Sequence, residues 1–125
     1  MNLAEIKNII KYKYSIEVYN QPAIEIDGSF DVNKEDGIEE ASLTILSCSE
    51  NCENDHILTL LHELAHYLDY KMHGFTAYKT LTQMEPYYYE LRAWRIAKRL
   101  ARVFEVDFDL DFVQECLDTY TKEVA

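Results

Sequence analysis

The hydrophobic pattern changes its period twice along the chain, and this change constrains the fold more than any other feature of the sequence. Residues 2–13 carry apolar side chains at helical spacing, which predicts a helix. Between residues 15 and 47, apolar and polar residues alternate, which predicts three or four short strands. The helical period returns after residue 55. This order of elements is typical of an α+β domain.

The strand region consists of short apolar pairs separated by turn residues. The pairs are Ile16 and Val18, Ile24 and Ile26, Phe30 and Val32, and Leu43 and Ile45. The turn residues are Asn20-Gln21-Pro22, Asp27-Gly28 and Asp36-Gly37. We expect hairpins to link the strands into a small antiparallel or mixed sheet.

Three further helices are expected after the sheet. The first spans Ile57 to His73. We expect an Asn or Asp between residues 51 and 55 to cap its N-terminus and Gly74 to stop it. A loop containing Thr76, Thr80 and Thr82 then leads to Pro86, which suits the first turn of a helix reaching about Phe104. The last helix covers Asp109 to Lys122.

Length and charge exclude several classes of protein. The chain has 125 residues, enough for one domain spanning residues 1–125. Its formal net charge of −11 argues against nucleic-acid binding, because phosphate contact needs a basic surface. It has no apolar run of the roughly 20 residues that a membrane span needs, and residues 1–15 lack the apolar stretch of a signal peptide, so we expect neither. The odd number of cysteines, 3, argues against a disulfide framework, so we expect a cytoplasmic protein.

Residues 62–66 form an HExxH motif, His-Glu-Leu-Ala-His. Two imidazoles at positions i and i+4 of a helix lie one above the other and can bind one Zn²⁺ ion. Glu63 then lies beside the open position of the metal, where it can take a proton from water. The alternative is that these residues form an ordinary solvent-exposed side of the helix.

A catalytic zinc ion needs a third protein ligand besides the two histidines. Asp69 and His73 are close in sequence, but they lie about 10 Å and about 16 Å along the helix axis from His62. Neither reaches the same ion unless the helix breaks after His66. We therefore expect Asp69 to orient a ligand imidazole by a hydrogen bond, with an exposed acid as the alternative.

Glu90 is the predicted third ligand. On the helix that begins at Pro86, it lies in the middle of the apolar face, opposite the arginines at positions 92, 95, 99 and 102. A carboxylate in this place needs a partner because its desolvation is costly. The small residues Ala93 and Ala97 would let this helix approach the HExxH helix closely. The alternative is that Glu90 only complements the N-terminus of its own helix.

An HExxH helix completed by a glutamate on the next helix resembles the gluzincin type of zinc metallopeptidase. More narrowly, Ile57–His66 followed by Glu90-Leu91-Arg92-Ala93 and Ala97 resembles the small ImmA/IrrE-type metallopeptidases of phages and mobile elements. The resemblance covers roughly residues 15–104 and implies a minimal zincin-like domain that hydrolyses peptide bonds. It also implies that His62, His66 and Glu90 bind the zinc ion and that Glu63 is the general base.

Two further groups of residues are open to more than one interpretation. His73 and Tyr70 are candidates to stabilise the negative charge that builds on an attacked amide, as are Tyr78 and the tyrosines at positions 87–89. These tyrosines could equally be packing residues. Cys48, Cys52 and His56 follow one another at steps of four, but no fourth ligand accompanies them. We expect Cys48 and Cys52 to be loop thiols without a metal.

Together these observations predict a zinc-dependent endopeptidase that uses one Zn²⁺ ion and acts on a protein or peptide substrate. The strand over residues 43–47 is expected to hold that substrate by β-augmentation. The alternative is a non-enzymatic interaction protein, such as a mobile-element regulator that keeps the zincin fold as a binding surface. A DNA-associated HExxH protease of the SprT kind is disfavoured, because the chain has no zinc ribbon of paired cysteines and its charge is acidic.

Overall fold

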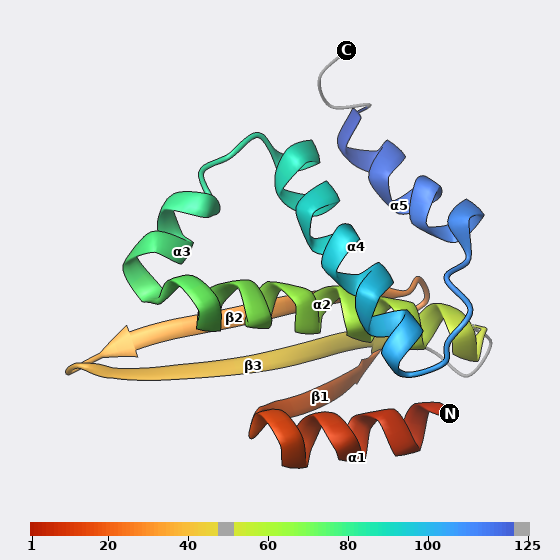
Figure 1. The fold of residues 1–125 in the computed structure, drawn as a ribbon, viewed down its shortest axis with the longest axis horizontal. Helices are drawn as coiled ribbons and strands as arrows, with labels where there is room; N and C mark the ends of the chain where they lie inside the picture. Colours follow the sequence, from red (N-terminus) through yellow and green to blue (C-terminus); the bar gives the residue numbers. More distant parts are fainter. Residues whose placement is uncertain (48–51, 122–125) are drawn as a thin grey trace.

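The protein is described here by a computed structural model that covers residues 1–47 and 52–121 (Figure 1). The fold is α+β, as predicted: an N-terminal helix, a three-stranded mixed sheet, and then further helices. The elements of the described residues are α1 (Leu3–Tyr14), β1 (Glu17–Pro22), β2 (Asp27–Glu35), β3 (Ile38–Ser47), α2 (Glu53–His73), α3 (Phe75–Leu81), α4 (Pro86–Val103) and α5 (Leu110–Thr121).

The sheet has the strand order β1-β3-β2, so β3 is the central strand. β2 and β3 form the antiparallel hairpin predicted at Asp36-Gly37, where both residues have positive φ angles of 51° and 78°. Positive φ at both central residues is the geometry of a type I′ turn, whose twist matches that of the strands. β1 pairs with β3 in parallel, with Val18 opposite Leu43.

The prediction that the first strands form hairpins was wrong. Residues 24–26 are not a strand, and Asp27-Gly28 begins β2 instead of forming a turn. Ile24 is 92% exposed, so its alternation with Ile26 does not reflect a buried sheet face. The chain instead crosses from β1 at one edge of the sheet to β2 at the other, which lets β1 pair with β3.

α2 is the central helix of the molecule. It contacts β2, β3, α1, α3 and α4, and Figure 1 shows it running along the hairpin with α4 crossing it. Residues 57–67 are all buried, as expected for a helix covered on several sides. The helix begins at Glu53 after Cys52, which makes no side-chain cap, so the predicted Asn or Asp cap was wrong. It ends at Gly74, as predicted, with φ of 84°.

α3 occupies a segment that we expected to be a loop. Its threonines favour the helix only weakly, so the sequence signal was poor. Tyr78, which is 3% exposed, packs edge-on against the rings of Phe30 and Tyr70. This packing stabilises a helix of only 7 residues, which would be unstable in isolation.

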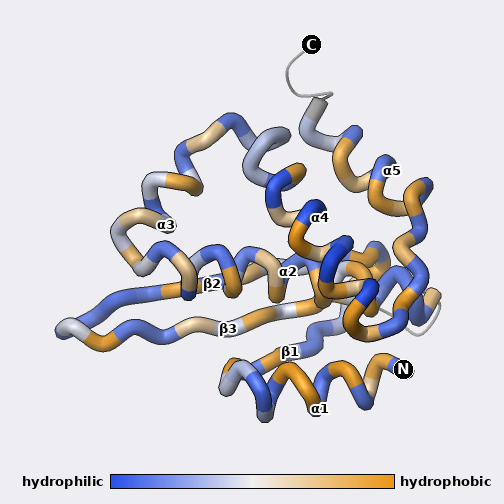
Figure 2. The backbone as a smooth tube through the Cα atoms, in the orientation of Figure 1, coloured by the Kyte–Doolittle hydropathy of each residue, from blue (hydrophilic) through white to orange (hydrophobic). Residues whose placement is uncertain are grey.

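α4 and α5 complete the domain. Pro86 occupies the first turn of α4, as predicted, and the buried Ala93, Ala97 and Ala101 allow close packing against α2. α5 packs against α4, where Trp94 contacts the ring of Phe112. Figure 2 shows that the far half of the β2–β3 hairpin is mostly hydrophilic, in agreement with the exposure of residues 33–40. Within the described residues, no helix combines the length and apolar character that crossing a membrane requires.

Candidate metal centre

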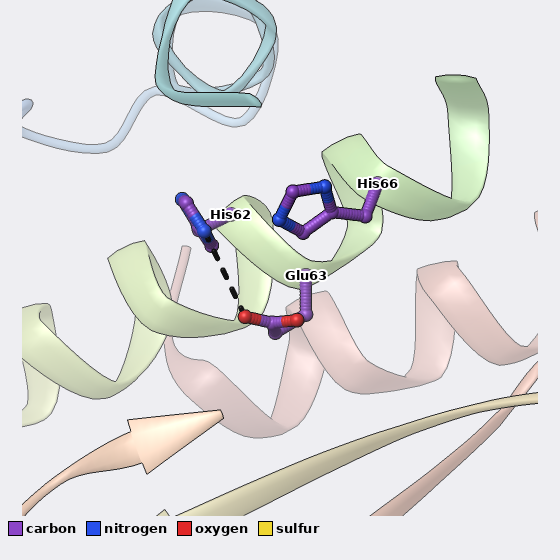
Figure 3. Close-up of side chains that lie close together, drawn as sticks. All are labelled: His62, Glu63 and His66. Carbon is purple, nitrogen blue, oxygen red and sulfur yellow. Dashed lines mark ion pairs between the residues drawn. The ribbon is translucent and has the colours of Figure 1, made fainter. Parts of the chain in front are cut away.

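The HExxH residues lie on the buried middle of α2 and form a group that could hold one metal ion. His62, Glu63 and His66 are 7%, 6% and 4% exposed, so the alternative of a solvent-exposed side was wrong for these residues. Their nearest ligand atoms all lie within 4.8 Å of one another. Figure 3 shows the two imidazoles one turn apart, with Glu63 beside them and its ion pair to His62 drawn as a dashed line.

Glu90 reaches this group from α4. Its Oε2 atom lies 2.5 Å from Nε2 of His62 and 3.3 Å from Nε2 of His66. Its side chain is 13% exposed, and it points at the imidazoles and not at the N-terminus of its own helix. One carboxylate oxygen therefore contacts both HExxH imidazoles.

The carboxylates of Glu63 and Glu90 have pKa values shifted in opposite directions. Burial raises the pKa of Glu63 well above its ordinary value, and the negative charges of Glu90 and Asp27 raise it further. Burial also acts to raise the pKa of Glu90, but hydrogen bonds with His62 and His66 outweigh it and lower this pKa to about 2. Burial lowers the pKa of His62, which favours the neutral imidazole that a metal needs. Glu90 is thus the acceptor of the group, and Glu63 is the carboxylate with the greater proton affinity.

The donor geometry fits a zinc ion with a small adjustment. Donors about 2.0–2.2 Å from a tetrahedral zinc ion are about 3.3 Å apart. The distance of 3.3 Å between His66 Nε2 and Glu90 Oε2 matches this spacing, whereas the 2.5 Å from His62 Nε2 to the same oxygen has to lengthen. His62 Nδ1 is buried without a hydrogen-bond partner in the described structure. When Nε2 binds a metal ion, Nδ1 is the ring nitrogen that carries the proton.

Aromatic side chains of α4 hold the two imidazoles in place. The ring of Tyr89 stacks on His66 with centroids 4.5 Å apart and an angle of 18°. Trp94 lies against His62 at 4.3 Å. The Tyr89 hydroxyl is hydrogen-bonded to that of Tyr78 on α3. Nothing in the sequence pattern of α4 indicates that the ring of Trp94 contacts a histidine.

Asp69, three residues after His66 on α2, contacts different partners from those expected. Arg92 donates hydrogen bonds of 2.6 Å and 2.9 Å to its carboxylate, which is 3% exposed. His73 Nε2 lies 3.3 Å from the same carboxylate. The strong pairing with the guanidinium explains why Asp69 turns to α4 instead of to a ligand imidazole. It also shows that Arg92 faces α2, which corrects its expected place among the outward arginines.

The structure places neither Tyr70 nor His73 in the cavity that contains the metal group. The Tyr70 hydroxyl donates to the carboxylate of Glu39 on β3. The His73 side chain is 34% exposed and pairs with Asp69. The expectation that these two residues stabilise negative charge at the site therefore has no support in their positions.

A cavity of about 880 Å³ opens in front of the metal group. Its walls come from α2, α4, α5, the first residues of β2 with the chain leading into them, and one residue of β3. The lining residues used below are Glu25, Asp27, Gly28, Glu63, Cys116 and Tyr120. The wall formed by α5 was missed by the sequence analysis, because Phe112, Cys116 and Tyr120 at steps of four have the spacing of ordinary core contacts.

β2 meets the HExxH helix at Gly28. A Cβ atom on this residue would lie 2.8 Å from Cγ of Glu63 and 2.9 Å from Cγ2 of Thr59. These distances are shorter than ordinary carbon contacts of about 3.5–4.0 Å. The absence of a side chain at Gly28 therefore allows the start of β2 to lie directly against Glu63.

The cysteine group considered as a second metal site is only partly described. Cys52 is free and exposed, and Cys48 lies outside the described residues. In the part of the chain that the structure covers, His62, Glu63 and His66 are the one group with metal-ligand spacing. The expectation of loop thiols without a metal stays a prediction.

No protein-family model, no curated protein and no solved structure matches the chain. The α+β fold and the buried His62-Glu63-His66 group are therefore the observations from which a function has to be argued.

Proposed function

We propose that the protein is a zinc-dependent endopeptidase of the zincin type. One observation carries this proposal: Glu90 of α4 contacts Nε2 of both HExxH imidazoles, with Glu63 beside them and a cavity in front. Two imidazoles and one carboxylate form the donor set of a catalytic zinc site that keeps a position open. A purely structural site would have no use for a buried glutamate at this position.

His62, His66 and Glu90 would hold the ion. When bound, zinc polarises a carbonyl group and makes water easier to deprotonate. The low pKa of Glu90, about 2, means that its carboxylate is charged near neutral pH and ready to bind a cation. Tyr89 and Trp94 limit the rotation of the imidazoles, so less ordering is needed when the ion binds.

Glu63 would move the proton. Its burial and its raised pKa give it the proton affinity of a base that takes a proton from the attacking water. It would then pass that proton to the nitrogen of the leaving amine as the peptide bond breaks. The positive charge of the ion would lower its pKa again and keep it in the carboxylate form at the start of the reaction.

The peptide substrate would lie along β2 and not along β3. β3 is the central strand, so both of its edges are already paired, and the expectation that residues 43–47 bind substrate was wrong. β2 pairs only with β3 among the described strands, and residues 27–30 line the cavity. An extended peptide that adds to the outer edge of β2 would pass in front of Glu63.

Metal analysis of single variants tests the proposal. The purified protein should contain a single zinc ion per chain, measured by inductively coupled plasma mass spectrometry. Glu90→Ala and the isosteric Glu90→Gln should bind zinc far more weakly. Glu85→Ala is the matched control, because this exposed carboxylate begins the same helix without making a side-chain cap. If Glu90→Gln binds zinc as tightly as the parent protein, Glu90 is not the third ligand.

Hydrolysis is tested separately with Glu63→Gln and a library of short fluorogenic peptides. This variant should keep its zinc and lose hydrolysis, because it keeps the shape of the side chain but not its basicity. A zinc-loaded parent protein that cleaves no peptide or protein would overturn the enzyme proposal. That outcome would favour the non-enzymatic interaction protein instead.

A further inference from the structure

We infer that the substrate carries a basic side chain next to the scissile bond, and that Asp27 recognises it. This inference rests on the proposed peptidase function and names the chemical class of its substrate. The cavity in front of the metal group has polar side chains fixed in its wall, because three of its lining residues, His62, Glu63 and His66, are more than nine-tenths buried. The question is which side chains such a cavity accepts.

Among the described residues, the charges that line the cavity are acidic apart from the two histidines. The lining includes four carboxylates, those of Glu25, Asp27, Glu63 and Glu90, and no lysine or arginine from residues 1–47 and 52–121. Glu63 and Glu90 have roles in the proposed centre. Glu25 and Asp27 are exposed, and neither forms an ion pair within the described structure. Two negative charges, one at the first residue of β2 and one two residues before it, therefore have no cationic partner in the described part of the chain.

Asp27 occupies the position from which it can contact a substrate side chain. It precedes Gly28, the residue that touches Glu63, and its Oδ1 accepts a hydrogen bond of 2.8 Å from the Gly28 amide. Asp27 lines the cavity together with Glu63 on α2 and with Cys116 and Tyr120 on α5. Strand residues are about 3.3 Å apart, so Asp27 is one residue along β2 from the place where Gly28 lies against Glu63.

A lysine or arginine in the substrate would pair with this carboxylate, whereas a glutamate would meet like charge. Attraction to one charge and repulsion of the other together give greater discrimination than either alone. The net charge of −11 acts in the same direction, because it raises the encounter rate with cationic partners. We expect kcat/KM to differ by tenfold or more between peptides with Lys and with Glu at this position.

The test compares fluorogenic peptides that differ only in having Lys, Gln or Glu at each position around the scissile bond. The parent protein should prefer Lys at one position, and added salt should weaken that preference. Asp27→Asn should reduce the preference about tenfold, and Asp27→Lys should reverse it, while zinc content stays unchanged. Asp31→Asn is the matched control, because Asp31 is exposed on the same strand, four residues further, but does not line the cavity.

Two results separate this inference from the proposed function. If the peptides are cleaved but Lys and Glu are equivalent, or if Asp27→Asn keeps the full preference, the inference is wrong and the peptidase stands. If no peptide is cleaved, the binding of the same peptides to Glu63→Gln, followed by fluorescence anisotropy, still reads the charge preference. Equal binding of the Lys and Glu peptides would then overturn the inference.

Discussion

Replacement of Gly28 by alanine tests the close packing of β2 on the HExxH helix. The added Cβ would lie 2.8 Å from Cγ of Glu63, 2.9 Å from Cγ2 of Thr59 and 3.3 Å from Cδ1 of Ile45. These three residues are 6%, 8% and 2% exposed, so their side chains have little room to move. The backbone of Gly28 is ordinary strand and would accept alanine, so the effect is steric.

The expected cost follows from these overlaps. Overpacking a well-packed interior costs about 1–3 kcal/mol, and the loss of glycine freedom in the unfolded chain returns about 0.4–1 kcal/mol. We therefore expect Gly28→Ala to lower the free energy of unfolding by about 1–2 kcal/mol. The measurement is urea unfolding followed by circular dichroism. Ser29→Ala, an exposed change at the next residue, should stay within about 0.5 kcal/mol of the parent protein.

If the proposed peptidase function holds, the same substitution should separate metal binding from hydrolysis. The methyl group pushes on Glu63 and not on the contacts that Glu90 makes with the two imidazoles, so zinc content should be unchanged. A displacement of Glu63 by about 1 Å can cost about a hundredfold in rate. A Gly28→Ala protein that is as stable and as active as the parent would show that β2 does not press on Glu63, and would refute this reasoning.

Three other outcomes are expected. Arg92→Ala leaves the buried Asp69 without its guanidinium partner and should lower the free energy of unfolding, measured in urea, by about 2–4 kcal/mol. Replacement of the exposed Arg95 by alanine should change it little, and equal losses in the two variants would contradict the role of the Arg92–Asp69 pair. Burial raises the pKa of the Cys116 thiol to about 11, so the rate of its alkylation should be slow at pH 8 and rise about tenfold per pH unit up to pH 10. Mass spectrometry of the peptide that contains Cys116 measures this rate, and a plateau near pH 9 would exclude the raised pKa. Trp94→Ala removes the ring that contacts both His62 and Phe112, and should speed amide hydrogen exchange in α5. Trp94→Phe should largely restore protection from exchange. Unchanged exchange in Trp94→Ala would show that α5 does not depend on this contact.

Much of the helical structure follows from local patterns. The end of one helix at Gly74 and the start of another at Pro86 were predicted from single residues. Glycine allows the backbone conformation that ends a helix, and proline fixes the φ angle that suits the first turn of one. The two-residue turn at Asp36-Gly37 has the same local cause. The placement of Glu90 near the HExxH helix was also predictable, because a carboxylate on an apolar face needs a partner.

The parts that escaped prediction depend on contacts between distant residues. Whether β1 pairs with β2 or β3 is decided by packing across the sheet, and alternation within residues 16–18 carries no information about it. α3 is held by Tyr78 and its ring neighbours, against the preference of its threonines. Asp69 binds Arg92 from a different helix, and α5 supplies a wall of the cavity from the far end of the chain. Each of these needed a partner that the sequence alone does not identify.

The parallel pairing of β1 with β3 has a consequence for how the chain reaches its native state. The β2–β3 hairpin can form from neighbouring residues, but β1 joins only after β3 exists, across a separation of about 25 residues between Val18 and Leu43. Until then β3 presents an unpaired edge that includes Leu43 and Ile45. Such an edge is a template for association with another chain. Removal of α1 and β1 should therefore leave a protein that self-associates during refolding, even though every residue of the candidate metal centre is still present.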